Sequence, residues 1–153
     1  MLIEGKFTLK APIKEVWNFL LEPGTLASCI PGAEKMEAVD SKTWTGVVKQ
    51  KVGPISVKLN FTQTFTEVDP PRHLKAVGKG SEATKAGTFT QETTVNLTEI
   101  GKSEVEIAYT SNVSLVGRMA TFGERIMRAK IKSVGDEFAR NLQGKMQSRI
   151  GGK

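Results

Sequence analysis

The sequence contains few of the residue types that form most enzyme active sites and metal sites. Its 153 residues include one cysteine, one histidine and one tyrosine. A single cysteine cannot form an internal disulfide, and His73 has no second histidine or cysteine to complete a metal-ligand set or a nucleophile pair. No histidine, lysine or arginine lies within four residues of Cys29 to activate its thiol. We therefore expect a buried, passive Cys29, a His73 at the surface or a strand edge, and no metal ion or cofactor.

Long apolar segments are also absent. No run approaches the roughly 18 apolar residues that a membrane-spanning helix requires, because even VWNFLL is interrupted by Asn18. The opening residues MLIEGKFTLK have neither the basic nor the apolar region of a signal peptide. The sequence predicts a cytoplasmic protein that does not span a membrane. Its length and composition, with 39% hydrophobic and 25% charged residues, predict one domain over residues 1–148 and a short flexible tail over 149–153.

The hydrophobic period changes twice along the chain. Residues 2–9 alternate loosely, which indicates a strand, and residues 11–23 have the period of a helix, after which Pro23 can open a second short helix. Residues 33–115 form alternating runs separated by turn-rich clusters, which predicts six further antiparallel strands. The clearest run covers residues 55–68, and its apolar face contains Val57, Leu59, Phe61 and Phe65.

Residues 118–146 return to the helical period and predict one amphipathic helix of about 30 residues, roughly 45 Å long. Strands followed by a helix are typical of the α+β class. We expect a curved seven-stranded antiparallel sheet wrapped around a long C-terminal helix, with two short helices after the first strand. Gly123 and Gly135 would each cost about 1 kcal/mol inside the long helix, which indicates close packing or room for a ligand.

The net charge of +6 is concentrated near the C-terminus. Residues 1–117 carry 13 basic and 13 acidic side chains, whereas the last 36 residues carry nine basic and three acidic ones. The long helix could therefore dock to an anionic membrane surface or an acidic partner enzyme, and a merely solvated helix face is the alternative. The candidates for docking are Arg125, Arg128, Lys132, Arg140 and Arg149.

Polar side chains interrupt the apolar faces of the predicted strands. Buried amides and hydroxyls cost free energy unless they are partnered, so the pattern predicts a cavity that holds water or the polar head of a ligand. A register slip that exposes these residues is the alternative. Among the carboxylates, Glu67 fits the inward-facing alternation best. It lies near a strand end and has no acidic partner for acid–base catalysis. The polar residues in the inward register are Gln50, Gln63, Gln91, Thr93, Tyr109 and Ser111.

Four segments together resemble one known family. They read LASCIPGAEKME from residue 26, KVGPISVKLNF from residue 51, GKGSEATKAGTF from residue 78, and VGRMATFGERIM with VGDEF from residue 116. On these segments, spread over nearly the full chain, the sequence resembles the CoxG family of carbon monoxide dehydrogenase subunits, within the START-like, or SRPBCC, superfamily. The resemblance implies a helix-grip fold of the Bet v 1 type and an accessory role to molybdenum hydroxylases such as carbon monoxide dehydrogenase. It also implies recruitment to the inner membrane face and binding of an isoprenoid quinone or lipid. The resemblance does not imply an active site.

The resulting hypothesis is a non-catalytic carrier that holds an apolar ligand between the sheet and the long helix. Gln63, Gln91 and Tyr109 would orient a polar head group. The sheet wall of the cavity would contain Val57, Leu59, Phe61, Phe65, Phe89, Val95, Val105 and Ile107. The helix wall would contain Phe122, Ile126, Met127, Ile131, Val134 and Phe138.

Two other functions compete with this hypothesis. A small cyclase or hydrolase of the same superfamily could use Tyr109 as an acid, but the sequence offers no matching base. Nucleic-acid binding through the basic helix is disfavoured, because the solvent face around Lys58, Asn60 and Thr62 has no aromatic side chains for stacking. We therefore expect a small-molecule partner and no nucleic acid.

Overall fold

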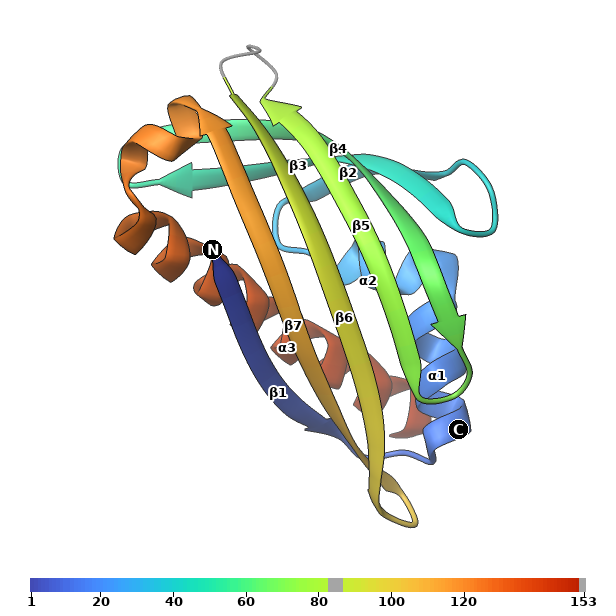
Figure 1. Cartoon of the computed structure of the whole chain (residues 1–153). Helices are drawn as coiled ribbons and strands as arrows, with labels where there is room; N and C mark the ends of the chain where they lie inside the picture. Colours follow the sequence, from blue (N-terminus) through green and yellow to red (C-terminus); the bar gives the residue numbers. More distant parts are fainter. Residues whose placement is uncertain (83–86, 152–153) are drawn as a thin grey trace.

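A seven-stranded antiparallel sheet forms the body of the molecule (Figure 1). The computed structural model describes residues 1–82 and 87–151. Each strand pairs with its sequence neighbour except that β1 joins the sheet beside the last strand, giving the order β1-β7-β6-β5-β4-β3-β2. The strands are β1 (Leu2–Leu9), β2 (Ala33–Ala38), β3 (Thr43–Val52), β4 (Ile55–Asp69), β5 (His73–Glu82), β6 (Gly87–Gly101) and β7 (Glu104–Gly117). The predicted α+β class and seven-stranded sheet are confirmed.

Two short helices follow β1, as the sequence predicts. Pro12 precedes the first turn of α1 (Ile13–Leu21), where a missing N–H is harmless, and α2 covers Pro23–Cys29. The inward face of α1 is fully buried, because its apolar residues recur at helical spacing. The buried residues of α1 are Ile13, Val16, Trp17, Phe19 and Leu20.

The long helix begins later than the sequence predicts. A short 3₁₀ helix, η1 (Arg118–Phe122), comes first, and α3 covers Glu124–Gly151. Gly117 and Gly123 flank η1 with φ values of +86° and +90°, a conformation that side chains disfavour, so the chain turns at both residues. The prediction of one continuous helix from residue 118 is therefore wrong, because Gly123 separates η1 from α3. α3 includes residues 149–151 of the predicted tail, while residues 152–153 lie outside the described residues.

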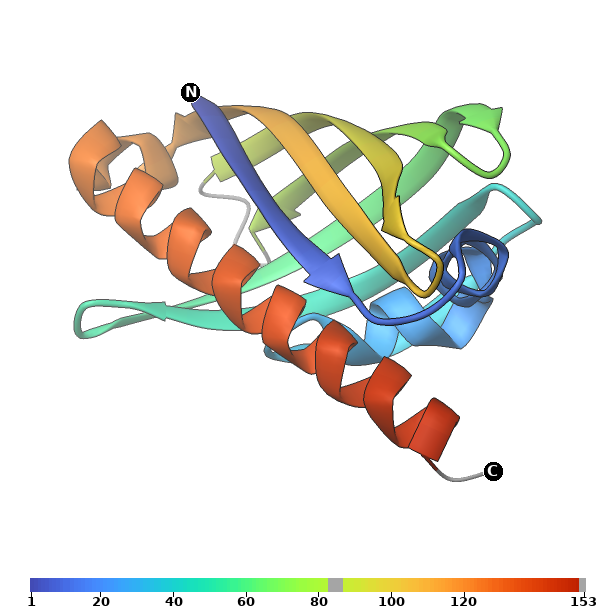
Figure 2. The same ribbon diagram turned by 90° about the horizontal axis from the view of Figure 1, so that it is seen from below.

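α3 crosses the concave side of the sheet, with α1 and α2 lying beside its C-terminal half (Figure 2). Hydrogen bonds fasten it along its length. Asn141 Nδ2 donates to the Cys29 carbonyl at 3.0 Å, and Gln143 Nε2 donates to the Thr8 carbonyl at 2.8 Å. Nearer its start, Arg128 donates to the Leu2 carbonyl. The helix is thereby held against both α2 and the edge strand β1.

Apolar side chains pack in two separate clusters, one toward each end of α3. The larger cluster joins α1, the sheet and the C-terminal half of α3, where Leu142 and Met146 are 1% and 2% exposed. The smaller cluster joins the start of α3 to the β3–β4 hairpin through Met127, Val52 and Val57. Along β4, β6 and β7, inward polar residues lie between the residues of the two clusters: Gln63, Gln91, Thr93, Tyr109 and Ser111.

Candidate ligand-binding site

The inner face of the sheet carries the residues that the alternation pattern predicts. Strand pairing places Phe61 opposite Gly80 and Gln63 opposite Gly78, and it places Gln91 opposite Val113. The register therefore keeps the inward polar residues on the same face as the phenylalanines, without the slip that would expose them.

A central band between the two apolar clusters remains partly open to solvent. We use this name for the half-buried inner side chains Phe61, Gln63, Phe65, Gln91, Val95, Tyr109, Ile131 and Val134. A side chain on the covered face of a sheet retains solvent contact only where protein does not fill the space around it. The band therefore keeps partial solvent contact and has apolar side chains on both the sheet and α3.

The other residues predicted to line the cavity fall into three groups: fully buried, half-buried and exposed. Four are fully buried within the two clusters, where they support the band from either end: Val57, Val105, Ile107 and Met127. Four more are half-buried against those clusters: Leu59, Phe89, Phe122 and Phe138. Ile126 is 55% exposed, because it lies about a quarter turn from Met127 on α3. The structure thus places Ile126 on the surface, apart from the other predicted residues.

Tyr109 connects the sheet to α3 across the band. Its ring lies over Gly5 of β1, and its hydroxyl oxygen is 3.2 Å from the position that a Cβ atom at Gly135 would occupy. Gly135 is therefore explained by close packing. Burial raises the pKa of Tyr109, and the negative charge of Asp136 adds to the effect, so the phenol stays protonated at neutral pH.

The inward polar groups form hydrogen bonds with one another. Gln91 Nε2 donates to Thr93 Oγ1 at 2.7 Å, and the Thr93 and Ser111 hydroxyls are 2.9 Å apart. Gln50 Nε2 donates to the Pro31 carbonyl at 2.6 Å. These bonds offset part of the cost of removing the groups from water, while the amide oxygens can still accept hydrogen bonds.

Glu82 is an inward residue that the sequence reasoning missed. It is 2% exposed and lies opposite Leu59 in the strand register. The alternation through Gly78 and Gly80 continues to Glu82 and could have revealed it. The two glycines concealed the pattern because they carry no apolar side chain.

An open cleft of about 810 Å³ lies between the edge of the sheet and α3, and we call it the edge cleft. β2 pairs with β3 only as far as Val48, so the end of β3 forms a sheet edge beside the helix. Sequence reasoning did not anticipate this cleft, whose lining comes from four separate segments. Its lining residues are Pro31, Gly32, Lys49, Gln50, Lys51, Ser56, Val57, Lys58, Lys130 and Glu137.

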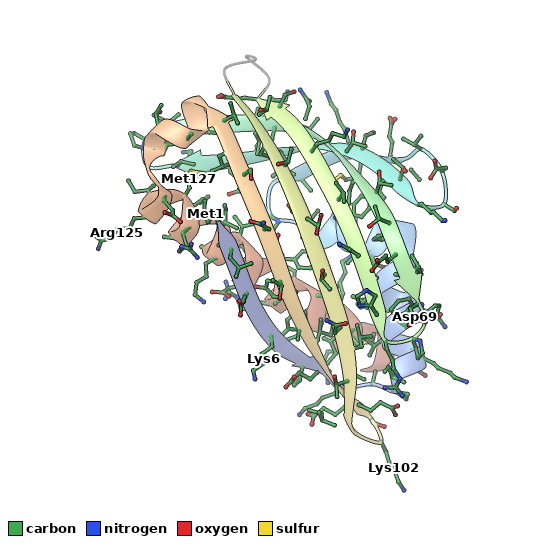
Figure 3. The ribbon with its side chains drawn as sticks, viewed as in Figure 1. Met1, Lys6, Asp69, Lys102, Arg125 and Met127 are labelled. Atoms are coloured by element: carbon green, nitrogen blue, oxygen red, sulfur yellow. The ribbon has the colours of Figure 1, made fainter. Side chains whose placement is uncertain are left out.

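The predicted docking residues lie on α3, but two of them already have partners. Arg128 forms an ion pair with Glu124 at 3.1 Å, and Lys132 lies 4.0 Å from Asp136. Arg125 and Arg140 are exposed, and Figure 3 shows Arg125 pointing away from the body of the molecule. The side chain of Arg149 lies outside the described residues.

Cys29 is fully buried, as predicted. Burial raises the pKa of its thiol, an effect that the charge of Lys145 and a hydrogen bond with Ser28 oppose. A buried, protonated thiol is a poor nucleophile, so Cys29 acts as a packing residue at the end of α2.

His73 lies near the surface, as predicted, and bridges two neighbouring strands. In the protonated ring, Nδ1 donates to Asn96 Oδ1 at 2.8 Å and Nε2 donates to Glu67 Oε2 at 2.9 Å. These bonds, led by the one to Asn96, raise the pKa of His73. The bond from His73 in turn lowers the pKa of Glu67, which a register shift after Phe65 places on the exposed face.

The His73 bridge should make stability depend on pH. The raised pKa stabilises the fold below the unfolded value of 6.5, and this contribution is lost as pH rises through the folded pKa. The lowered Glu67 pKa contributes above 4.5 and is lost as pH falls through its folded value. Urea denaturation should show that His73→Gln destabilises most near pH 5.5 and least at pH 8.5. Arg72→Gln, which removes the neighbouring pair with Glu99, should show no such pH dependence, and a constant His73→Gln effect would contradict the prediction.

No group of three histidine, cysteine, aspartate or glutamate side chains that could hold a metal ion occurs within residues 1–82 and 87–151. None of the helices in the same ranges is long and apolar enough to cross a bilayer. The candidate site comprises the central band and the edge cleft, both between the curved sheet and the long helix.

These features define a helix-grip fold, in which a curved antiparallel sheet encloses a C-terminal helix, and START superfamily proteins share this fold. The chain belongs to the CoxG family of carbon monoxide dehydrogenase subunits, whose model matches residues 5–147. A search of the curated proteins finds no match.

Solved structures share the fold over nearly the whole chain. A conserved protein from Geobacillus kaustophilus aligns with a TM-score of 0.89 and 23% identity, covering 97% of this chain and 96% of that one. A START superfamily protein from Mycobacterium smegmatis aligns with a TM-score of 0.74 and 9% identity, covering 96% and 97%. The ZhuI aromatase/cyclase from Streptomyces sp. R1128 aligns with a TM-score of 0.71 and 13% identity, covering 98% and 95%. At these identities the similarity establishes the fold alone.

Proposed function

We propose that this protein is a non-catalytic carrier that holds an apolar small molecule, an isoprenoid quinone or a lipid, in the central band. The observation that carries the proposal is the partial exposure of apolar side chains on both walls of a covered interior, including Phe61, Phe65, Ile131 and Val134. Exposed apolar surface in a concave site is stabilised when a ligand covers it. Membership of the CoxG family is consistent with this role.

Polar groups within the band would orient the head of such a ligand. Tyr109 retains its proton and can donate to a carbonyl oxygen, such as that of a quinone ring. The side-chain amides of Gln63 and Gln91 can both donate and accept. A mainly apolar site with a few polar groups gives orientation as well as affinity.

The proposal predicts that filling the band will block binding. Decylubiquinone should quench the fluorescence of Trp44, which lies opposite Gln63 on the inner face. Val134→Phe should weaken binding at least about tenfold, because the added ring volume occupies the ligand's space. The matched control is Ile126→Phe, on the same helix but at an exposed position, and it should bind like the wild type. Equal binding by both variants, at unchanged thermal stability, would refute the assignment of the band.

The same proposal includes recruitment of a molybdenum hydroxylase, such as carbon monoxide dehydrogenase, to the inner membrane face. Arg125 and Arg140 are two of the exposed basic residues of α3, and they would contact an anionic leaflet. Each contributes about 1 kcal/mol near such a surface, and salt weakens the attraction. Flotation with anionic and neutral vesicles at low and high salt tests this contact, and equal recovery of the Arg125→Gln/Arg140→Gln variant would reject it.

An enzyme of the cyclase or hydrolase type is the second candidate, favoured by a protonated Tyr109 that lines the band. Tyr109 could act as a general acid toward a bound carbonyl compound. Tyr109→Phe distinguishes the two functions, because a carrier would lose only head-group affinity. Loss of turnover at unchanged ligand affinity would favour the enzyme.

A further inference from the structure

We propose that Gly78 is a positioning residue for the polar head of the ligand. It lets the side-chain amide of Gln63 lie across β5, where the amide meets a carbonyl or hydroxyl group of the bound molecule. The inference rests on the proposed function and deepens it, because it places the head group over the middle of the sheet.

The amide of Gln63 occupies the space above Gly78. The two residues lie directly opposite each other on β4 and β5, and Gln63 Oε1 is 2.7 Å from the position that a Cβ atom at Gly78 would occupy. Side chains of a strand ordinarily stand roughly perpendicular to the sheet. The side chain of Gln63 instead leans over the neighbouring strand, and Gly78 below it is buried.

The backbone gives no reason for a glycine at position 78. Gly78 is not among the residues with a positive φ, and the nearest backbone atom of β4 to its Cβ position, the Thr62 oxygen, is at an ordinary contact distance of 3.8 Å. Gly80 differs, because its Cβ would lie 2.5 Å from the Asn60 backbone oxygen. A glycine inside a strand weakens the strand and often marks the approach of a ligand or another backbone. Since no backbone approaches Gly78 closely, we infer that a ligand does.

Gln63 has no hydrogen bond that would explain its position. In the described part of the chain its side-chain amide has no hydrogen-bond partner, although the residue is half-buried. The amide oxygen and both N–H groups are therefore available to a ligand. Gln91 flanks Gly78 on the other side, on β6, and its Nε2 donates to Thr93. The row of Gln63, Gly78 and Gln91 thus offers donors and acceptors that suit a carbonyl or hydroxyl group.

Cover of a glycine by a neighbouring side chain is the simplest competing explanation. Aromatic side chains stabilise sheets in this way, and two rings in this sheet have the same arrangement: Tyr109 lies over Gly5, and Phe89 lies over Gly80. Both rings bury apolar surface. An amide buries little apolar surface and loses water when it is covered, so this explanation fits the two rings and does not fit Gln63.

The test compares decylubiquinone and decylbenzene by calorimetry, using the full chain and concentrations below aggregation. Both ligands have a six-membered ring and a decyl tail, but only the quinone carries polar groups on its ring. Gly78→Ala should weaken decylubiquinone binding about fivefold, which is the effect of losing one hydrogen bond, and should leave decylbenzene binding unchanged. Gly101→Ala is the matched control, because Gly101 ends β6 and its Cβ would make an ordinary 3.8 Å contact with Glu104. This control should bind both ligands like the wild type.

Stability and a double variant separate positioning from a structural role. Without ligand, Gly78→Ala should melt at the same temperature as the wild type or above it, because alanine loses less conformational freedom than glycine and the methyl group meets only the flexible end of Gln63. In a Gln63→Ala background, Gly78→Ala should cause no further loss of decylubiquinone affinity. A lower melting temperature, or losses of affinity that add in the double variant, would overturn the inference.

Three further results would decide against the inference. Equal decylubiquinone affinity of the wild type and Gly78→Ala would reject the positioning role and leave the carrier function intact. Weaker binding of both ligands would show that the added methyl group only fills ligand space. Failure of the wild type to bind either ligand would overturn the carrier function and the inference together.

Discussion

Replacing Gly32 with alanine is expected to destabilise the protein by more than roughly 3 kcal/mol. Gly32 has a φ of +79°, a left-handed conformation that costs other residues about 1–2 kcal/mol. The added Cβ would also collide with the backbone oxygen of Lys49 and lie 3.2 Å from Gln50 Nε2. Relief of the collision requires the loop to move, which breaks the 2.9 Å hydrogen bond from Lys49 N to the Gly32 carbonyl. Chemical denaturation would measure the loss.

Gly53→Ala is the matched control for this prediction. Gly53 also has a positive φ, +62°, but nothing lies within 4 Å of the position that its Cβ would occupy. The control should therefore lose only the conformational contribution of about 1–2 kcal/mol. Similar losses in the two variants would show that the contact with β3 does not determine the stability of this loop.

The second large effect is a difference in stability loss between two truncations on α3, one in the larger apolar cluster and one in the partly open band. Leu142 on α3 is 1% exposed and packs in the larger apolar cluster. Leu142→Ala should destabilise the protein by about 3 kcal/mol, because a cavity remains where the side chain was. Ile131→Ala, on the same helix but in the band, should cost about 1 kcal/mol or less. Urea denaturation of both variants tests the contrast.

Ligand binding should show the opposite order. Ile131→Ala removes part of the proposed ligand wall, so it should weaken decylubiquinone binding more than Leu142→Ala does under conditions where both variants are folded. Equal losses of stability in the two variants would mean that Ile131 is packed as tightly as Leu142. That result would contradict the description of the band as partly open.

Local periodicity was sufficient to predict most of the fold. The alternation over residues 55–68 corresponds closely to β4, and the inward stripe from Met127 to Leu142 identifies the face of α3 that packs on the sheet. The start of α3 was missed because apolar residues in η1 continue the helical period, whereas the backbone conformations of Gly117 and Gly123 interrupt it. Hydrophobic period carries no information on glycine φ values.

The candidate site was only partly predictable for a different reason. The polar residues of the band follow from alternation along single strands, so Gln63, Gln91 and Tyr109 could be proposed from the sequence. The edge cleft depends on strand register and on the approach of α3, which bring Lys49 and Lys58 together and add Lys130. These are contacts between segments that are distant in the sequence. A count of charges along the chain does not reveal which lysines lie side by side in the fold.

The pairing of β1 with β7 has a consequence for synthesis on the ribosome. Leu2 lies opposite Asn112, so the first strand cannot complete its hydrogen bonds until almost all of the sheet has been made. Forming such a long-range pair late in synthesis requires closing a large loop, which slows folding relative to a local hairpin. Until then, the apolar side of β1 stays exposed on the nascent chain. We therefore expect this strand to remain available to chaperones until β7 has been synthesised.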